Sequence, residues 1–187
     1  SLETSIQRYM AAEYSRQLSD KVFHGCVKVS QQGFSAGGTA VYGMARQLLD
    51  VNREPIRILR AGEHKQIANE RVSFTPKNDE TTDAVKKIFK LFVDDKYLIS
   101  DIVTFLNQKE IMSANNKRWD RAKIIKILTD ETYIGTRIYN KKWARLQQKS
   151  HTNPRSEWVI VPNAFEAIID EKIFNKAQER LYYLSSI

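Results

Sequence analysis

The clearest periodic pattern in the sequence lies just after Asp120. Ile124 is followed by apolar residues three and four positions later, at Ile127 and Leu128. Residues at these spacings share one side of an α-helix, so the pattern predicts a short amphipathic helix with that side in a core. Asp120 is the expected N-cap, because a carboxylate there accepts hydrogen bonds from the free amides of the first turn. Trp119 and the downstream Tyr133 are expected to close the core at its two ends.

The opposite side of this predicted helix is cationic. A helix that is apolar behind and carries cations and amides in front suits a nucleic-acid surface. A solvated surface helix would show the same pattern, and the helix alone favours neither interpretation. Ile125, on the outer side, fits either packing or a contact with a thymine methyl group. The candidate DNA contacts in and before the helix are Asn116, Lys117, Arg118, Arg121, Lys123 and Lys126.

Residues 2–32 are predicted to form one long helix, because this stretch lacks proline and is rich in helix-favouring residues. At about 1.5 Å per residue, such a helix is too long to be buried throughout in a domain of this size. We interpret it as a connector or dimerisation helix, and a surface helix packed on the body is the alternative. Lys28, near its end, is a further candidate DNA contact.

Residues 33–45 hold a glycine cluster that ends the long helix. Glycine permits sharp turns and close approach of the backbone to another surface. The composition fits a flexible hinge, or an extended arm in the minor groove of DNA, and by itself favours the hinge. The candidate DNA contacts here are Gly37, Gly38, Thr39, Tyr42 and Gly43.

The rest of the pattern predicts an α+β fold that is mainly helical. After the long helix we expect a three-helix, helix-turn-helix-like core with small β-hairpins and a C-terminal helix. Two helices, one beginning in the acidic run 79–83 and one capped by Ser100, precede the cationic helix. The expected strands and turns are a helical turn at 46–51, a strand at 56–60 paired with 71–74, and a basic strand from Thr136 paired with 157–161; a final helix spans 170–184.

Charge separates one part of the chain from the rest. The net charge is +8, and residues 101–150 carry 11 basic and 5 acidic side chains, whereas residues 151–187 carry 4 and 5. Clustered positive charge provides sequence-independent affinity for phosphate. The candidates after the cationic helix are Arg137, Lys141, Lys142 and Arg145.

Other functional classes find little support in the composition. The sequence shows neither a membrane-length apolar run nor an export signal, and its single cysteine, Cys26, excludes an intrachain disulfide, so we expect a cytoplasmic protein. The three histidines are scattered, so we expect no metal and no cofactor. Phosphate-binding loops and nucleophile elbows are absent, and Tyr182 and Tyr183 lack the cationic surroundings of a DNA-cleaving tyrosine. We therefore expect no catalytic residues in this chain.

Five segments, in order, resemble the central part of large serine recombinases, the family of phage integrases and transposon resolvases. Residues 10–22 resemble the connector helix of that family, and Gly37, Gly38, Tyr42 and Gly43 match its glycine-rich linker, although the prolines of the linker are absent. Residues 88–111 resemble its helix pair, residues 119–135 its Trp-to-Gly signature, and residues 161–181 the end of its DNA-binding domain. Asp120 replaces the usual threonine cap, and Asp130–Glu131 replace Asn-Pro.

The resemblance implies a connector helix at 1–32, a linker arm at 33–45 and a DNA-binding recombinase domain at 46–187. It implies that the arm follows the minor groove of double-stranded DNA while the helical core contacts the adjacent major groove. Arg121, Lys123 and Asn116 would then contact bases, and Lys126, Arg137, Lys141, Lys142 and Arg145 would contact phosphates. The catalytic domain and zinc ribbon of the family have no counterpart here, so we expect a middle piece of a dimeric or tetrameric recombinase. A protein-interaction module and a free-standing helix-turn-helix regulator are the alternatives.

Overall fold

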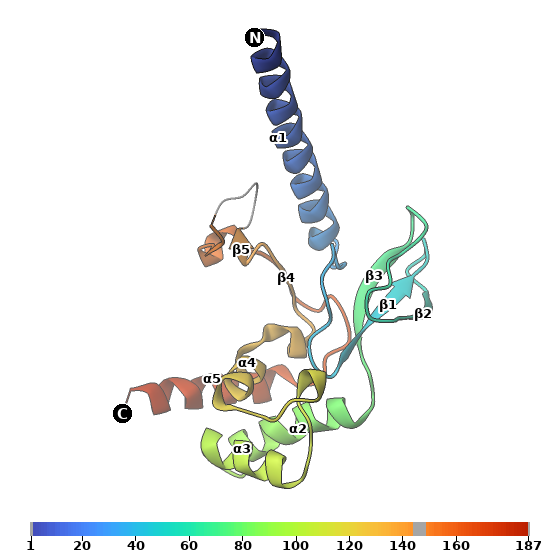
Figure 1. Ribbon diagram of the computed structural model, residues 1–187. Helices are drawn as coiled ribbons and strands as arrows, with labels where there is room; N and C mark the ends of the chain where they lie inside the picture. Colours follow the sequence, from blue (N-terminus) through green and yellow to red (C-terminus); the bar gives the residue numbers. More distant parts are fainter. Residues whose placement is uncertain (1, 144–148, 187) are drawn as a thin grey trace.

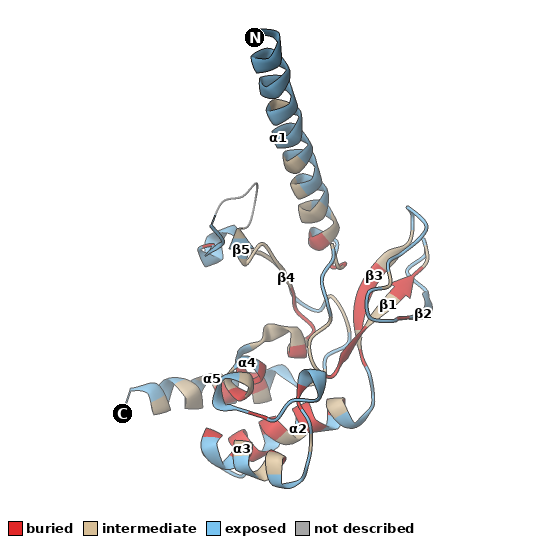
Figure 2. Ribbon diagram, in the orientation of Figure 1, coloured by how far each residue is buried: buried red, intermediate tan, exposed pale blue. Residues whose placement is uncertain are grey.

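The structure, a computed structural model, describes residues 2–143 and 149–186. Helix α1 (Leu2–Gln31) projects away from the rest of the molecule (Figure 1). Its apolar side chains are exposed, with Leu2 at 79% and Met10 at 65%, and Ser30 at its end is buried (Figure 2). The predicted long helix is therefore confirmed. The alternative interpretation, a surface helix packed on the body, is wrong for most of its length. Its C-terminal part contacts strands β4 (Arg137–Tyr139) and β7 (Val159–Val161).

A three-stranded antiparallel sheet follows the glycine-rich linker. Strand β1 (Met44–Leu49) lies between β2 (Pro55–Leu59) and β3 (Arg71–Pro76). The predicted helical turn at 46–51 is therefore wrong. The two expected strands exist, but each pairs with β1 rather than with the other. Leu48, Leu59 and Val72 form a small apolar cluster on one face of the sheet, which explains why β1, with its two apolar ends, occupies the centre.

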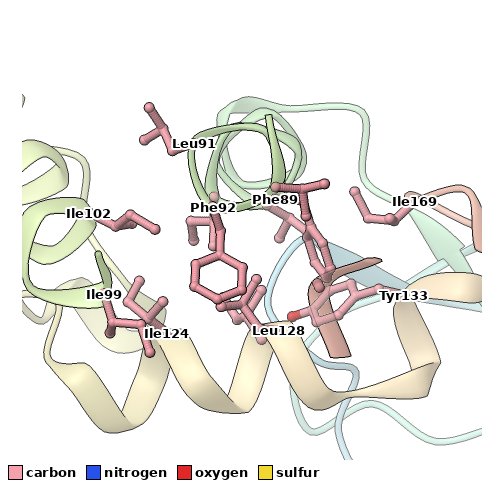
Figure 3. Close-up of a cluster of buried hydrophobic side chains, with 14 of the residues drawn as sticks. Phe89, Leu91, Phe92, Ile99, Ile102, Ile124, Leu128, Tyr133 and Ile169 are labelled. Carbon is pink, nitrogen blue, oxygen red and sulfur yellow. The ribbon is translucent and has the colours of Figure 1, made fainter. Parts of the chain in front are cut away.

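Four helices form the main body. Helices α2 (Glu80–Val93), α3 (Ile99–Gln108) and α4 (Arg121–Thr129) are the three predicted from the periodicity, and α5 (Glu171–Ser185) packs against α2 and α4. The side chains at their centre, which include Phe92, Ile124 and Leu128, are fully buried (Figure 3). Burial of such side chains contributes roughly 1.5–3 kcal/mol each, so this cluster is the main source of the stability of the body.

Carboxylates cap three of these helices. Asp79 accepts from the amides of Thr81 and Thr82, Asp120 from Lys123, and Asp170 from Lys172. The predicted cap of α3 is wrong. Ser100 lies inside α3, which begins after Leu98, and the Asp101 carboxylate accepts from the Leu98 amide at 3.3 Å.

A basic β-structure leaves the body after the short 3-10 helix η2 (Glu131–Ile134). The predicted pairing is confirmed between β4 and β7, and beyond it β5 (Lys142–Trp143) pairs with β6 (His151–Thr152). Two further 3-10 turns are η1 (Ala114–Asn116) and η3 (Arg155–Glu157). Among the described residues, no helix is long and apolar enough to cross a membrane.

Gly135 holds the turn between η2 and β4 in a conformation that favours glycine. Its φ is +79°, and a Cβ there would press into the carbonyl oxygen of Phe165. Gly135→Ala should lower the free energy of unfolding by about 2 kcal/mol or more, because it adds left-handed strain to a steric clash. Urea denaturation measures the loss.

Gly25→Ala is the matched control. Gly25 lies within α1 and its added Cβ would meet open space. Stability should stay equal or rise by up to about 1 kcal/mol. Equal effects of the two substitutions would contradict the role of Gly135 in the turn.

Candidate nucleic-acid interface

Helix α4 presents Lys126 to solvent because the opposite side of the helix is fixed in the core, and Arg121 is exposed at its first position. Ile124, Ile127 and Leu128 are buried, as predicted, while Arg121 and Lys126 are exposed. Ile125 is half-buried and packs against the core, beside a hollow that Leu181 and Leu184 also line. The structure therefore favours packing over a DNA contact for Ile125.

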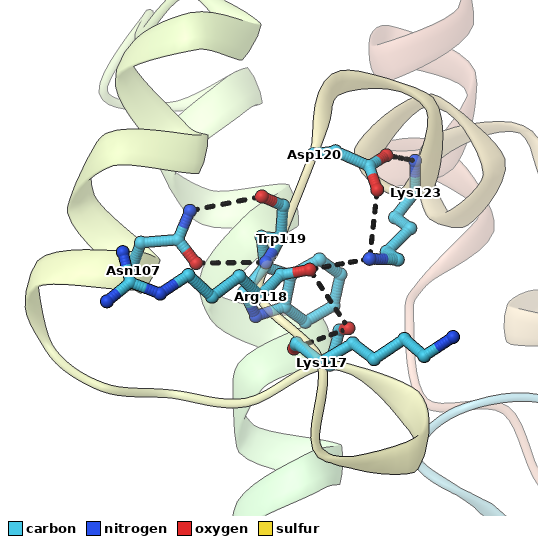
Figure 4. Close-up of polar contacts among 7 residues, drawn as sticks. Asn107, Lys117, Arg118, Trp119, Asp120 and Lys123 are labelled. Carbon is cyan, nitrogen blue, oxygen red and sulfur yellow. Dashed lines mark hydrogen bonds and ion pairs between the residues drawn. The ribbon is translucent and has the colours of Figure 1, made fainter.

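The connection from α3 to α4 is held by polar contacts on both sides of Trp119 (Figure 4). The Asn107 amide donates to the Trp119 carbonyl at 3.0 Å, and its carbonyl oxygen accepts from the Trp119 amide at 2.9 Å. The Ser113 amide and hydroxyl both donate to the Lys117 carbonyl, at 2.8 and 2.7 Å. These bonds fold η1 into a tight loop that presents the exposed side chains of Lys117 and Arg118.

Asn115 and Asn116 lie at the tip of this loop. Both have a left-handed backbone, with φ of 59° and 53°. Asparagine adopts this conformation at lower cost than most residues with a Cβ. Asn116 was predicted as a contact and is exposed; Asn115, which was not among the predicted contacts, is exposed beside it.

The ammonium of Lys123 is already engaged by its neighbours. It lies 2.9 Å from the Asp120 carboxylate and donates to the Arg118 carbonyl at 2.5 Å (Figure 4). The bond from the Lys123 side chain also holds the pKa of the Asp120 carboxyl below its ordinary value, and the Lys123 amide adds to the shift. Lys123 therefore supports the start of α4 and does not project freely toward bases.

The linker ends against the helical body at Tyr42. Its phenolic hydroxyl donates to the Met112 carbonyl at 2.7 Å, and its own carbonyl accepts from the Tyr133 hydroxyl at 3.0 Å. The Tyr42 ring lies edge-on to Trp119, with centroids 5.2 Å apart. Tyr42 thus connects the linker to the loop before α4 and to the segment after it.

A groove of about 750 Å³ lies between the linker and α4. Thr39 and Tyr42 line it from the linker, Asn115 and Lys117 from the loop, and Lys126 from the helix. Lys123 and the buried Trp119 also line it. The groove therefore brings together predicted contacts that are about 80 positions apart in the sequence, and the charged side chains in its lining are three lysines and one carboxylate, Asp130.

Two predicted contacts have structural roles instead. Gly43 is buried at a φ of +82°, and a Cβ there would lie 3.1 Å from the Val85 side chain, so this glycine allows the linker to pack on α2. Arg137 is only 9% exposed and lies over the Phe74 ring at 5.3 Å. Burial lowers the pKa of its guanidinium. Arg137 is therefore packed against the sheet and is not presented to solvent.

The remaining candidates lie outside the groove lining. Gly37 and Gly38 are exposed in the linker, upstream of the groove, and Lys28 is exposed near the end of α1. Lys141 packs over Trp158 at 5.3 Å, and Lys142 is exposed on β5. Arg145 lies outside the described residues.

Comparison with known proteins identifies the family. A family model described as "Recombinase" matches residues 79–182, from the cap of α2 into α5, which is more than half of the chain. The chain belongs to the Recombinase family. The predicted resemblance is thereby confirmed, and the matched region of this recombinase chain comprises the four-helix body and the β4–β7 structure.

A solved structure described as a crystal structure of an LSR–DNA complex has a similar fold. The TM-score is 0.53 at 15% sequence identity, and the similarity covers 88% of the recombinase chain described here. It covers 40% of the other chain, so the present sequence spans less than half of that protein. Since this coverage extends beyond the residues that the family model matches, the likeness in fold includes part of the region before α2.

Titration of the tyrosines tests whether the Tyr42 side chain is buried as described. Burial, together with the nearby Asp79 and Glu80 carboxylates, raises the pKa of Tyr42 to about 12 from 10.0. Burial likewise raises the pKa of Tyr133. The Tyr42 phenol ionises at lower pH in the unfolded chain than in the folded chain. The contribution of the neutral phenol to folding stability is therefore fully present below pH 10 and is lost as pH rises toward 12. Ultraviolet titration should show that the phenols of Tyr42 and Tyr133 ionise at higher pH than a free phenol.

Tyr42→Phe should remove one of these late phenols. Tyr133→Phe, which removes the other, is the matched comparison. If the ultraviolet titration curve of Tyr42→Phe were unchanged at high pH, the Tyr42 phenol would not be buried as described.

Proposed function

We propose that this chain binds double-stranded DNA sequence-specifically, as the recognition domain of a site-specific serine recombinase. Membership of the Recombinase family and a fold like that of an LSR–DNA complex support the proposal. The observation that carries it is the lysine-lined groove between the glycine-rich linker and the exposed face of α4. Catalysis would reside in a separate domain of the parent protein, which would act on DNA in the cytoplasm.

The groove on the protein separates two elements, the linker and α4, that would enter neighbouring grooves of DNA. The major groove is about 12 Å wide and admits an α-helix, whereas the minor groove is about 6 Å wide and admits an extended chain. If α4 occupies the major groove and residues 37–39 the adjacent minor groove, one sugar–phosphate strand must pass between them. Lys117 and Lys126 line the space where that strand would lie.

The exposed residues at the start of α4 then face the base edges. Arg121 is the first residue of α4 and Asn116 lies at the tip of the preceding loop. Arginine pairs with guanine and asparagine with adenine in two-point contacts. Because Asp120 and the Arg118 carbonyl hold the Lys123 ammonium, we place Lys123 beside the phosphate strand rather than at a base.

The basic strands provide a second surface for phosphate. Lys142 is exposed on β5, and Arg145 and Lys149 follow it in the sequence before β6. We propose that these cations, together with Lys28 on α1, contact the DNA backbone outside the groove. Such contacts would add affinity for every sequence and no preference among bases.

The exposed side of α1 favours a contact between copies of the parent protein. Ile6, Leu18 and Val22 are each about half exposed, although apolar residues in a monomer are usually covered. We propose that α1 joins the DNA-binding body to the rest of a dimeric or tetrameric recombinase. A protein-interaction module would expose the same side of α1. The DNA-binding measurements below distinguish such a module from a DNA-binding domain.

Lys126→Ala should weaken binding to all duplexes and reduce the dependence of binding on salt. Loss of one phosphate contact should lower the slope of log K against log salt concentration by about 0.9. Fluorescence anisotropy with a labelled duplex at several salt concentrations measures the slope. Lys176→Ala is the control, because Lys176 is exposed on α5, a helix that packs against α4 through its opposite side.

An unchanged slope in Lys126→Ala would rule out the phosphate contact. A wild-type chain that forms stable dimers and ignores DNA even at low salt would instead support the protein-interaction alternative. Equal effects at Lys126 and Lys176 would indicate a general charge effect rather than a local contact.

Arg121→Ala should relax the preference at one base pair by about 1–3 kcal/mol. The measurement compares single-base variants of a duplex that the wild-type chain selects from a random pool. Arg121→Lys keeps the charge but loses the two-point geometry, so it should retain affinity for random DNA and still lose discrimination. Equal losses on selected and random DNA would contradict a base contact at Arg121.

A further inference from the structure

The linker is held at both ends and exposed between them: ahead of its exposed glycines, Phe34 is buried and the Ser35 amide donates to the Val72 carbonyl at 2.7 Å. Upstream, Gly37 and Gly38 are exposed, and an added Cβ at either would meet no other atom of the described chain within 4 Å. Downstream, Gly43 is buried, and its carbonyl accepts from the Thr82 hydroxyl at 2.9 Å and from the Lys77 amide at 3.0 Å. The exposed middle of the linker joins the helical body at Tyr42.

Tyr42 is held from both sides of α4. Its hydroxyl bonds to Met112, ahead of the tight loop, and its carbonyl bonds to Tyr133, behind the helix. Its ring lies edge-on to the buried ring of Trp119, directly before the cap of α4. These contacts join positions 70 and 91 residues apart in the sequence, so they are tertiary contacts and not part of any local turn.

The groups that hold Tyr42 are themselves fixed. Tyr133 is 2% exposed and its ring packs near Phe89, with centroids 6.4 Å apart. Asn107 holds the Trp119 backbone through both its amide donor and its carbonyl acceptor. The downstream end of the linker therefore has a defined position relative to the start of α4.

We propose that Tyr42 is a positioning residue that sets the distance between the minor-groove contact of the linker and the major-groove contact of α4. This inference rests on the proposed DNA binding. Its consequence is selectivity for spacing: the chain distinguishes sites by the number of base pairs between the two contacted segments, in addition to the bases themselves.

DNA geometry makes spacing a sensitive variable. One extra base pair moves the second segment by about 3.4 Å along the axis and turns it by about 35°. Hydrogen bonds weaken steeply beyond about 3.2 Å, so the contacts at Tyr42 cannot follow such a shift without breaking. A linker fixed at Tyr42 must therefore lose one groove contact on a site of altered spacing, whereas a released linker can adapt through its glycines.

The test uses the 187-residue chain and a duplex that it selects from a random pool. Versions of the duplex with one base pair inserted or deleted between the minor-groove and major-groove segments give the spacing series. Wild type should bind the altered duplexes about tenfold or more weakly than the selected duplex, because each altered duplex loses one or two contacts. Tyr42→Phe combined with Tyr133→Phe removes both hydrogen bonds but keeps both rings, and its preference should fall to about threefold or less.

Ile102→Val is the control for simple loss of stability. Ile102 is fully buried in α3 and has no role in the linker contacts, and the substitution costs about 1 kcal/mol. This variant should show a lower unfolding midpoint and an unchanged spacing preference. If the double tyrosine variant keeps the wild-type spacing preference, or if Ile102→Val loses it, the positioning role of Tyr42 is overturned.

Two further outcomes separate this inference from the proposed function. A wild-type chain that selects a duplex but binds all spacings equally overturns the inference alone. A wild-type chain that enriches no duplex from the pool overturns the proposed DNA binding, and the inference with it.

Discussion

Burial of one side of α4 is the constraint on which the rest of the site depends. Ile124 and Leu128 are fully buried against α2, α3 and α5, which fixes the rotation of the helix about its axis. Lys126 must then face outward, because residues on opposite sides of a helix cannot share one environment, and Arg121 is exposed as the first residue of α4. The same packing holds Trp119 and Tyr133 at the two ends of the helix, and these are the residues that Tyr42 contacts. Core packing thus sets both the exposed cations and the attachment of the linker.

The groove between linker and helix follows from this attachment. Gly43 allows close packing on α2, and Tyr42 connects the linker to segments on both sides of α4. The cost of burying polar tyrosine hydroxyls is offset because each donates to a backbone carbonyl. Lys117 and Lys126 remain free to line the groove, whereas Lys123 stabilises the start of α4. Only part of the local positive charge is therefore available for a ligand.

The sequence predicts features that depend on neighbouring residues better than features that depend on tertiary contacts. Helix periodicity placed α2, α3, α4 and α5, and the Asp120 cap was predicted because capping is local; Asp79 and Asp170 cap α2 and α5 at their expected starts. Strand β1 was missed because its central position depends on partners 6–13 residues away in β2 and 22–32 residues away in β3. Gly43 and Arg137 were predicted to contact DNA from composition, but their packing against Val85 and Phe74 is set by the fold. The candidate site was thus predicted as a set of residues and not as a geometry.

The central claim is that linker and α4 hold one DNA strand between adjacent grooves. Methylation interference on a selected duplex tests it directly, because methyl groups at adenine N3 block the minor groove and those at guanine N7 block the major groove. The account predicts a short block of minor-groove interference immediately beside a block of major-groove interference, and Lys126→Ala should weaken binding to the phosphates between them. Interference confined to one groove, or two blocks separated by a full helical turn, would contradict it.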